Sequence, residues 1–205
     1  MKLIDLSHEI YDGMPVYPGD TETSLVQIKH LGTDGYNNFR LDINMHSGTH
    51  IDSPMHLTDS SQYISESPPE SFIGEGCMLD VRNQPVIKYK REYDTLVKDY
   101  SIVLLYTGFD SYYGTKEYYE NHPCIDMELA RFYIQKKVKM VGMDTPSPDK
   151  YPFEVHKLLL KNNICILENL KNLGQLLNAE RFEVIAFPLK IKADSSVARA
   201  FARVI

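Results

Sequence analysis

Apolar and polar residues alternate most regularly between residues 39 and 46. Apolar side chains occupy positions 39, 41, 43 and 45, and polar ones occupy positions 40, 42, 44 and 46. Because successive side chains of a β-strand point to opposite faces, this pattern predicts an amphipathic strand with His46 on its polar face. Shorter or less regular apolar runs predict further strands over residues 2–6, 24–30, 77–81 and 102–106.

The second half of the chain alternates between helical and strand patterns. Residues 126–137 carry apolar side chains at helical spacing behind Asp126, a residue type that often caps a helix N-terminus. The same reasoning predicts helices over 153–161 and 171–177, and strands over 138–143, 164–167 and 182–189. A β-rich first half followed by an alternating second half predicts an α/β fold in which a mixed sheet is layered with helices.

Composition narrows the class of protein. A length of 205 residues, without repeat or linker, predicts a single domain over residues 1–205, with residues 58–71 as a surface connector. The chain has 22 Lys and Arg against 28 Asp and Glu, and this net charge of −6 disfavours nucleic acid and anionic membranes as partners. Three separated cysteines disfavour a disulfide framework or a thiolate zinc site. The polar N-terminus and the lack of a long apolar run predict a soluble, cytoplasmic protein.

The segment 46–56 reads His-Ser-Gly-Thr-His-Ile-Asp-Ser-Pro-Met-His and holds four candidate ligands or proton carriers, His46, His50, Asp52 and His56. All four numbers are even, so an extended backbone would turn these side chains to one side, although Gly48 and Pro54 bend that line. A helix would also bring His46 and His50 together, but Gly48 between them disfavours it. Imidazoles and carboxylates suit Zn²⁺ and Mn²⁺, so the spacing favours a metal site over a merely polar turn.

A catalytic metal site also needs ligands from elsewhere in the chain. Glu168 directly follows a predicted buried strand, where open sheets place their ligands. His156 lies on a predicted helix, and its context alone favours an ordinary surface or core histidine. The remaining histidines stand in ordinary polar contexts and are given no role. The chain lacks a Gly-x-Ser-x-Gly elbow, a phosphate-binding glycine loop and a cysteine in a basic context, so those chemistries are disfavoured.

Segment 46–56 resembles the His-x-Gly-Thr-His-x-Asp-x-Pro-x-His motif of the metal-dependent cyclase family, which includes bacterial kynurenine formamidases and isatin hydrolases. Other segments resemble further motifs of this family along nearly the whole chain: 4–7, 14–20, 107–109, 144–147, 168–170 and 196–200. The resemblance implies a swivelling β/β/α fold and a homodimer or homotetramer. The Pro-rich segment 67–72 and the many tyrosines also fit a contact between subunits.

The resemblance also implies the site residues. Its metal ligands match His46, His50, Asp52, His156 and Glu168, with Asp52 bridging where two ions bind, and its proton carrier matches His56. One or two Zn²⁺ or Mn²⁺ ions per subunit are expected. Tyr17 stands where many kynurenine formamidases carry Trp, and it is the candidate aromatic wall for a substrate ring.

These features predict a metal-dependent hydrolase of a small amide, most specifically of N-formylkynurenine or a similar aryl formamide. A bound metal would polarise the carbonyl and activate water, and His56 would carry a proton to the leaving nitrogen. Protons competing for the ligands should lower activity in acid. The alternatives are a lactam or lactone hydrolase, a ring-closing cyclase or dehydratase, and a non-catalytic metal-binding module. The last is disfavoured because such a module needs the ligands but not His56.

Overall fold

A closed mixed sheet dominates the computed structural model, which describes residues 2–205. The sheet has the order β1-β12-β11-β5-β7-β9-β10-β4, and because β12 also pairs with β4, all strands except β1 form a ring. The β5–β7, β7–β9 and β9–β10 pairs are parallel and the others antiparallel. The strands are β1 (Lys2–Asp5), β4 (His50–Asp52), β5 (Ile73–Asp80), β7 (Ile102–Tyr106), β9 (Met140–Met143), β10 (Cys165–Glu168), β11 (Phe182–Pro188) and β12 (Ser195–Val204).

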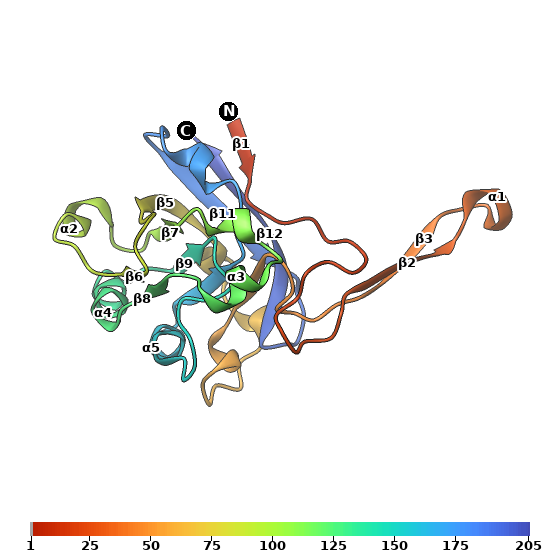
Figure 1. Cartoon of the computed structure of the whole chain (residues 1–205), viewed down its shortest axis with the longest axis horizontal. Coiled ribbons are helices and arrows are strands. Elements are labelled where there is room, and N and C mark those ends of the chain that lie inside the picture. Colours follow the sequence, from red (N-terminus) through yellow and green to blue (C-terminus); the bar gives the residue numbers. More distant parts are fainter. Residues whose placement is uncertain (1) are drawn as a thin grey trace.

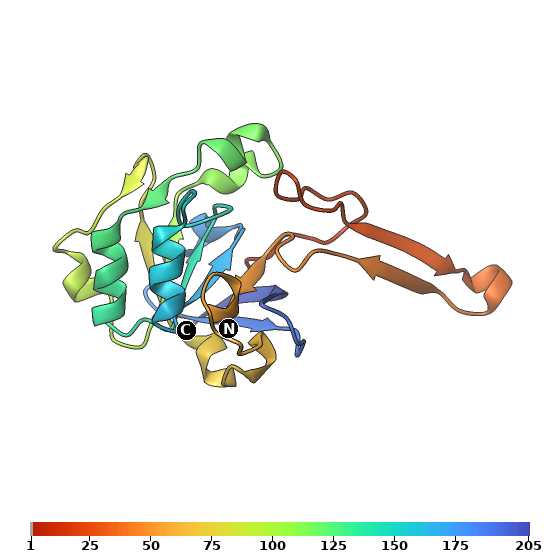
Figure 2. The same cartoon turned by 90° about the horizontal axis from the view of Figure 1, so that it is seen from below.

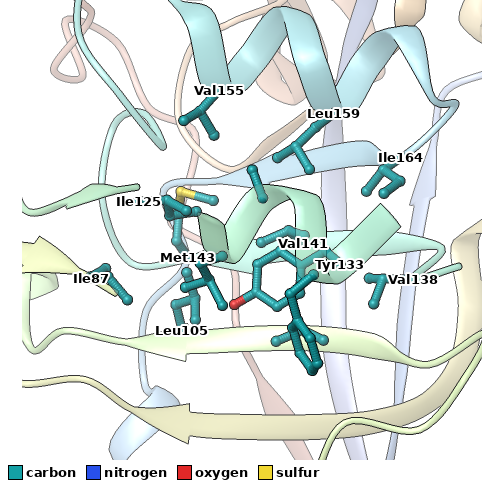
Figure 3. Close-up of a cluster of buried hydrophobic side chains, with 14 of the residues drawn as sticks. Ile87, Leu105, Ile125, Tyr133, Val138, Val141, Met143, Val155, Leu159 and Ile164 are labelled. Carbon is teal, nitrogen blue, oxygen red and sulfur yellow. The ribbon is translucent and has the colours of Figure 1, made fainter. Parts of the chain in front are cut away.

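Two helices cover the outer face of this sheet. Figure 2 shows α4 (Met127–Gln135) and α5 (Glu154–Lys161) side by side against it. The layer between helices and sheet is an apolar core in which Tyr133 of α4 contacts the outward side chains of β7 and β9 (Figure 3). The inward side chains of the same strands, with Ile51 of β4, form a second core inside the ring. Because the central strands are buried on both faces, they appear in the sequence as continuous apolar runs.

Shorter elements connect and flank the sheet. Two small sheets pair β2 (Ser24–Lys29) with β3 (Asn38–Asp42) and β6 (Val86–Ile87) with β8 (Cys124–Ile125). Short α-helices are α1 (Leu31–Asp34), α2 (Tyr93–Leu96) and α3 (Lys116–Glu120). The 3₁₀ turns are η1 (Pro54–His56), η2 (Ile64–Glu66), η3 (Pro69–Phe72), η4 (Phe109–Tyr112) and η5 (Leu173–Leu176). No helix within residues 2–205 combines the length and apolar character needed to cross a bilayer.

The fold class predicted from the sequence, a mixed sheet layered with helices, is confirmed, and most elements lie within two residues of their expected bounds. Asp126 caps α4 as expected, because its carboxylate accepts a hydrogen bond from the Leu129 N–H at 2.8 Å. Segment 171–177 forms only the 3₁₀ turn η5 rather than a helix. The long strand β12 was not predicted, since alternation in 195–204 is interrupted by small residues.

The predicted strand over 39–46 is wrong in its extent and in its packing. The strand β3 ends at Asp42, and all of its residues are exposed. With β2 and α1 it forms a hairpin, residues 24–42, that projects far from the rest of the molecule (Figures 1 and 2). The alternation is therefore real, but the apolar face it produces covers no core within this chain. We call this hairpin the arm.

Candidate metal and active site

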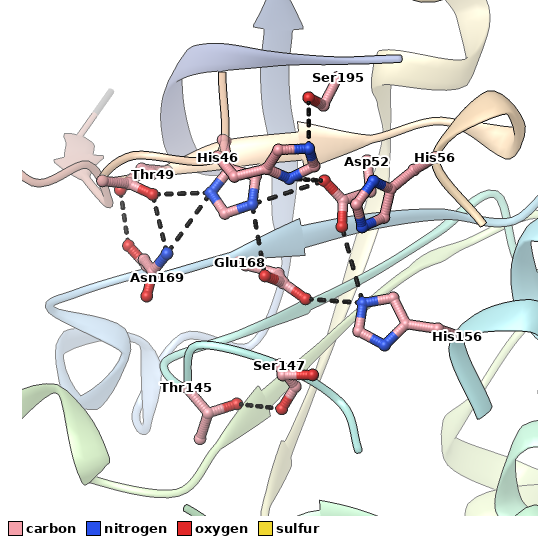
Figure 4. Close-up of polar contacts among 12 residues, drawn as sticks. His46, Thr49, Asp52, His56, Thr145, Ser147, His156, Glu168, Asn169 and Ser195 are labelled. Atoms are coloured by element: carbon pink, nitrogen blue, oxygen red, sulfur yellow. Dashed lines mark hydrogen bonds and ion pairs between the residues drawn. The ribbon is translucent and has the colours of Figure 1, made fainter. Parts of the chain in front are cut away.

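Three sheet and helix elements bring the predicted ligands together. His50 and Asp52 lie two residues apart on β4 and so point to the same side. Glu168, the last residue of β10, pairs directly with His50 across the antiparallel β4–β10 ladder. His156 comes from the first turn of α5, which packs over β10. His46 lies in the turn before β4. Figure 4 shows His46, Asp52, His156 and Glu168 converging, and His50 lies within 3.5 Å of both carboxylates.

The two carboxylates form the centre of this cluster. His46 Nδ1 lies 2.9 Å from Asp52 Oδ1, and His50 Nε2 lies 3.5 Å from the same oxygen and 3.3 Å from Glu168 Oε2. His156 Nε2 is 3.1 Å from Glu168 Oε1 and 3.6 Å from Asp52 Oδ2. Asp52 thus faces all three imidazoles, from a position that is 1% exposed.

The second nitrogen of each imidazole is held from outside the cluster. His50 Nδ1 donates to the Gly48 carbonyl at 2.8 Å, and His156 Nδ1 donates to Asp149 at 2.7 Å. His46 Nε2 lies 3.0 Å from Asp194 Oδ2. Metal-ligating histidines show this pattern, because an acceptor on the outer nitrogen fixes the ring and leaves the inner lone pair for the metal.

Unsatisfied polar atoms show that the cluster fits a cation. His50 Nε2 and Asp52 Oδ1 are buried and make no hydrogen bond. Leaving a buried polar group without a partner costs about 1–3 kcal/mol, so native proteins rarely keep two such atoms side by side. A divalent ion accepts lone pairs from both atoms at once, and the mixed nitrogen and oxygen donors suit Zn²⁺ or Mn²⁺. The residues present therefore fit a metal.

The carboxylates of the cluster also change the pKa values of its imidazoles. Burial opposes a charged His46, but the neighbouring carboxylates of Asp194 and Asp52 outweigh burial and raise the pKa of His46 to about 10. Burial likewise opposes charge on His156, and its three carboxylate partners raise its pKa well above the usual value. Burial would raise the pKa of Asp52, yet the neighbouring imidazoles of His156 and His46 hold that pKa well below its usual range. Metal binding must therefore displace protons from imidazoles.

The predicted extended line through segment 46–56 is only partly correct. It holds for His50 and Asp52, but His46 precedes a sharp bend at Gly48, whose φ is +60°, and His56 lies in the 3₁₀ turn η1. A side chain at Gly48 would be strained there, and its Cβ would lie 2.7 Å from Met14 Cε. The bend folds His46 back over Asp52, so the four residues still meet.

His56 stands at the edge of the cluster and lines a cavity. Its Nδ1 lies 3.0 Å from Asp194 Oδ2, and its ring centroid is 4.2 Å from that of His46. The cavity has a volume of about 260 Å³ and extends from the ligand cluster to a wall of tyrosines and prolines. Tyr17, the predicted wall residue, lines it and contacts Tyr119 edge-on at 5.7 Å between ring centroids. The other lining residues outside the ligand cluster are Pro15, Val16, Asp20, Gly48, Leu57, Tyr113, Pro146, Ser147, Phe153 and Asn169.

Sequence reasoning missed the two outer carboxylates. Asp149 holds His156 and also accepts from the Val155 N–H at 2.7 Å, which ties the start of α5 to the site. Asp194 holds both His46 and His56 from a position 138 residues or more along the chain. Asp149 lies seven residues before His156 and just ahead of the predicted helix. An acidic residue in that place was a signal that could have identified it as a partner of His156. No local spacing pointed to Asp194.

Several known proteins are similar to this chain over nearly its whole length. A model of the putative cyclase family matches residues 4–150. Kynurenine formamidases from Bacillus cereus and Bacillus anthracis are 30% and 29% identical, over 98% and 100% of this chain and 97% and 98% of theirs. Isatin hydrolase A from Labrenzia aggregata, bound to benzyl benzoate, is 23% identical and superposes with a TM-score of 0.86, covering 99% of this chain and 93% of that one.

A second solved structure, described as a potential metal-dependent hydrolase with cyclase activity, is 23% identical with a TM-score of 0.81, covering 100% of this chain and 98% of the other. At this level of identity the two structures establish a shared fold. Family membership rests on the family model and on the match of 30% identity over nearly the full length of both chains. This chain belongs to the putative cyclase family.

Proposed function

We propose that this protein is a metal-dependent hydrolase of small amides, and specifically an aryl formamidase that acts on N-formylkynurenine or a close relative. One observation carries the proposal: the carboxylate-centred imidazole cluster opens into an aromatic cavity that is also lined by a further imidazole, His56. The kynurenine formamidases that resemble this chain along its full length support the choice of substrate.

Two groups of residues have different roles in the proposed hydrolysis. A metal held by His46, His50, Asp52, His156 and Glu168 would polarise the carbonyl and acidify water. His56 takes one proton from the water whose oxygen adds to the formyl carbon. It returns that proton to the leaving nitrogen as the C–N bond breaks, so formate and a free aryl amine are released. A proton carrier of this kind contributes about 10²–10⁴-fold in rate.

We propose that the cluster would hold two ions, with Asp52 belonging to both groups of donors. His46 and His50 approach Asp52 Oδ1, at 2.9 and 3.5 Å, and His156 approaches Asp52 Oδ2 at 3.6 Å. Glu168 likewise faces His50 with one oxygen and His156 with the other. Two sets of donors therefore share Asp52. Zn²⁺ and Mn²⁺ both suit these donors.

The cavity favours an aryl substrate with an ammonium group. Tyr17, Tyr119 and Phe153 supply ring faces and edges for an aryl group. Asp20 is the one carboxylate of the described lining that lies outside the ligand set, and no Lys or Arg belongs to that lining. An α-ammonium group, as in N-formylkynurenine, would find a partner in Asp20. A free substrate carboxylate would depend on solvent or backbone donors.

Turnover of three substrate types tests this proposal. The metal-loaded protein should hydrolyse N-formylkynurenine with a kcat/KM at least about tenfold above that for isatin, and further above that for simple aliphatic amides, because those lack the ring or the ammonium group. Asp20→Asn should reduce this preference without changing hydrolysis of formanilide. A kcat/KM for N-formylkynurenine no higher than for the aliphatic amides would refute the formamidase.

The second candidate is a hydrolase of a neutral cyclic amide such as isatin. The absence of Lys and Arg from the described lining favours it, because an uncharged ring needs no cation. The superposition with isatin hydrolase A is compatible with it. The same assay separates the two candidates, since isatin would then be the better substrate and Asp20→Asn would have no effect.

We also propose that the protein is a homo-oligomer, at least a dimer. The Pro-rich segment 67–72 gives little support, because Phe72 is buried in the core of its own chain. The arm supports the proposal better. Phe39, Leu41 and Leu31 on it are 57%, 44% and 64% exposed, and the arm projects too far to fold them onto its own body. Closed dimers are the commonest assemblies, and a second copy offers such an arm a surface to cover.

A further inference from the structure

One carboxylate, Asp194, contacts both kinds of functional imidazole in the site. Its Oδ2 lies 3.0 Å from Nε2 of the predicted ligand His46 and 3.0 Å from Nδ1 of the predicted proton carrier His56. Each distance is that of an N–H···O hydrogen bond, and a carboxylate oxygen has lone pairs for both donors. Asp194 therefore sits between the ligand cluster and the cavity.

The fold fixes Asp194 firmly. It directly precedes β12, whose first residue, Ser195, pairs with Asp52 across the β12–β4 ladder. The Asp194 carbonyl accepts hydrogen bonds from both the N–H and the hydroxyl of Ser53, at 3.1 and 2.7 Å. Ser53 is fully buried and stands next to Asp52. Asp194 is thus attached by its backbone to the residue that directly follows the strand carrying His50 and Asp52.

We propose, on the basis of the hydrolase function above, that Asp194 is a positioning residue that sets the tautomer of both imidazoles. By accepting the Nδ1–H of His56, it leaves His56 Nε2 with the lone pair that takes a proton from water. By accepting the Nε2–H of His46, it leaves His46 Nδ1 free for the metal. Which ring nitrogen carries the proton is set by the partner of the other nitrogen.

The contacts also explain how Asp194 would act during turnover. When His56 Nε2 accepts a proton, the ring becomes a cation that is already hydrogen-bonded to a carboxylate. Asp194 Oδ2 faces the N–H groups of both imidazoles at 3.0 Å, and an ionised carboxylate, which only accepts hydrogen bonds, suits both contacts. The charge on His56 is therefore stabilised at the moment it forms, which is the role of an ionised orienting carboxylate beside a general base.

The first test measures the tautomer directly. In zinc-loaded wild-type protein above pH 8, ¹⁵N NMR of the histidine rings should show the His56 proton on Nδ1. In Asp194→Asn this proton should move, at least in part, to Nε2. A wild-type His56 that carries its proton on Nε2 would overturn the proposal. This result holds or fails even if the protein hydrolyses no amide, so it is independent of the proposed function.

The second test is a double-mutant cycle at saturating zinc. Asp194→Asn should lower kcat by about 10²-fold with KM nearly unchanged. In a His56→Ala background the same substitution should cost no more than about threefold, because the residue it acts through is gone. An equal loss in both backgrounds would show that Asp194 acts on turnover by another route and would refute the coupling to His56.

The third test concerns His46 and includes a matched control. Asp194→Asn should weaken zinc affinity by about 10- to 100-fold, measured by competition with a chromophoric chelator. Asp149→Asn, which removes the carboxylate behind His156, should weaken zinc affinity similarly. Its kcat loss at saturating zinc should persist in the His56→Ala background, because Asp149 does not contact His56. Unchanged zinc affinity in Asp194→Asn would remove His46 from the proposal.

Discussion

At the scale of single residues, the site is distinguished by two buried polar atoms that have no hydrogen-bond partner. His50 Nε2 and Asp52 Oδ1 are buried without hydrogen bonds, while the outer nitrogens of His46, His50 and His156 all have acceptors. A folded protein tolerates this asymmetry when a ligand completes the inner side. The inner atoms therefore mark the place where we propose that an ion binds.

Substitution of the ligands should separate metal binding from proton transfer. We expect His50→Ala and Asp52→Ala to lose stoichiometric metal by elemental analysis, because each removes an inner donor. His56→Ala should keep its metal and lose about 10²–10⁴-fold in kcat. One donor atom each of His46, Asp52 and His56 lie within 4.8 Å of one another, so loss of metal in His56→Ala would instead make His56 a ligand.

His8 should make stability depend on pH. It is stacked on Tyr113 with ring centroids 3.7 Å apart, and burial, aided by Lys171, lowers the pKa of His8 to about 4. Between pH 6.5 and 4 the unfolded chain binds more protons than the folded one, so stability falls as pH falls through this window. The shift corresponds to about 3 kcal/mol at most.

A matched variant isolates this contribution. His8→Phe keeps an aromatic ring on Tyr113 but cannot take up a proton. Its free energy of unfolding, from urea titrations at pH 7 and pH 4.5, should fall less than that of the wild type. Equal losses in the two proteins would contradict the assignment to His8.

At the scale of elements, close packing between strands restricts which residues can line the ring. Gly76 of β5 lies under the ring of Phe182 on β11, and a Cβ there would be 2.1 Å from Phe182 Cε2. Gly74, two residues earlier on the same face, has no atom closer than 3.6 Å to such a Cβ. The sheet thus needs glycine at only one of these two positions.

Alanine at each position tests this difference. Gly76→Ala should lower the free energy of unfolding by about 1–3 kcal/mol, because Phe182 must move from a buried position. Gly74→Ala should be neutral or slightly stabilising, since alanine restricts the unfolded chain. Chemical denaturation of both variants measures the contrast, and equal effects would show that the Phe182 ring moves aside freely.

At the scale of the whole molecule, the arm exposes apolar side chains that a single copy of the chain does not cover. Its pairs Leu25–Leu41 and Gln27–Phe39 place three apolar side chains on one face of a two-stranded hairpin. Isolated two-stranded hairpins are only marginally stable in water, so we expect the arm to pack against another surface. The proposed second copy supplies one.

Charge on the apolar face of the arm should separate the subunits. We expect light scattering to give at least a dimer for the wild type and half that mass or less for Phe39→Glu/Leu41→Glu. Arg40→Glu is the control, because Arg40 lies between these residues on the opposite face and should leave the mass unchanged. A wild-type monomer at micromolar concentration would refute the oligomer.

Short-range patterns in the sequence determined much of this protein. The continuous apolar runs of β7 and β10 predicted buried strands, and the Asp126 cap predicted the start of α4. The spacing of His50 and Asp52 predicted that both face one way, and β4 confirms it. These features depend on neighbours a few residues apart, whose geometry is set by the local backbone. The family motif added His156 and Glu168, whose contexts alone were ambiguous.

Tertiary structure decided what lies far apart in the chain. Closing of the ring by β4, between β10 and β12, brings Glu168 and Asp194 to segment 46–56. No local pattern encodes that closure, because register between distant strands is fixed by how their faces pack together. For the same reason alternation over 39–46 predicted an apolar face but not whether any core would cover it. Local sequence sets which face is apolar, and only the assembled molecule decides what that face contacts.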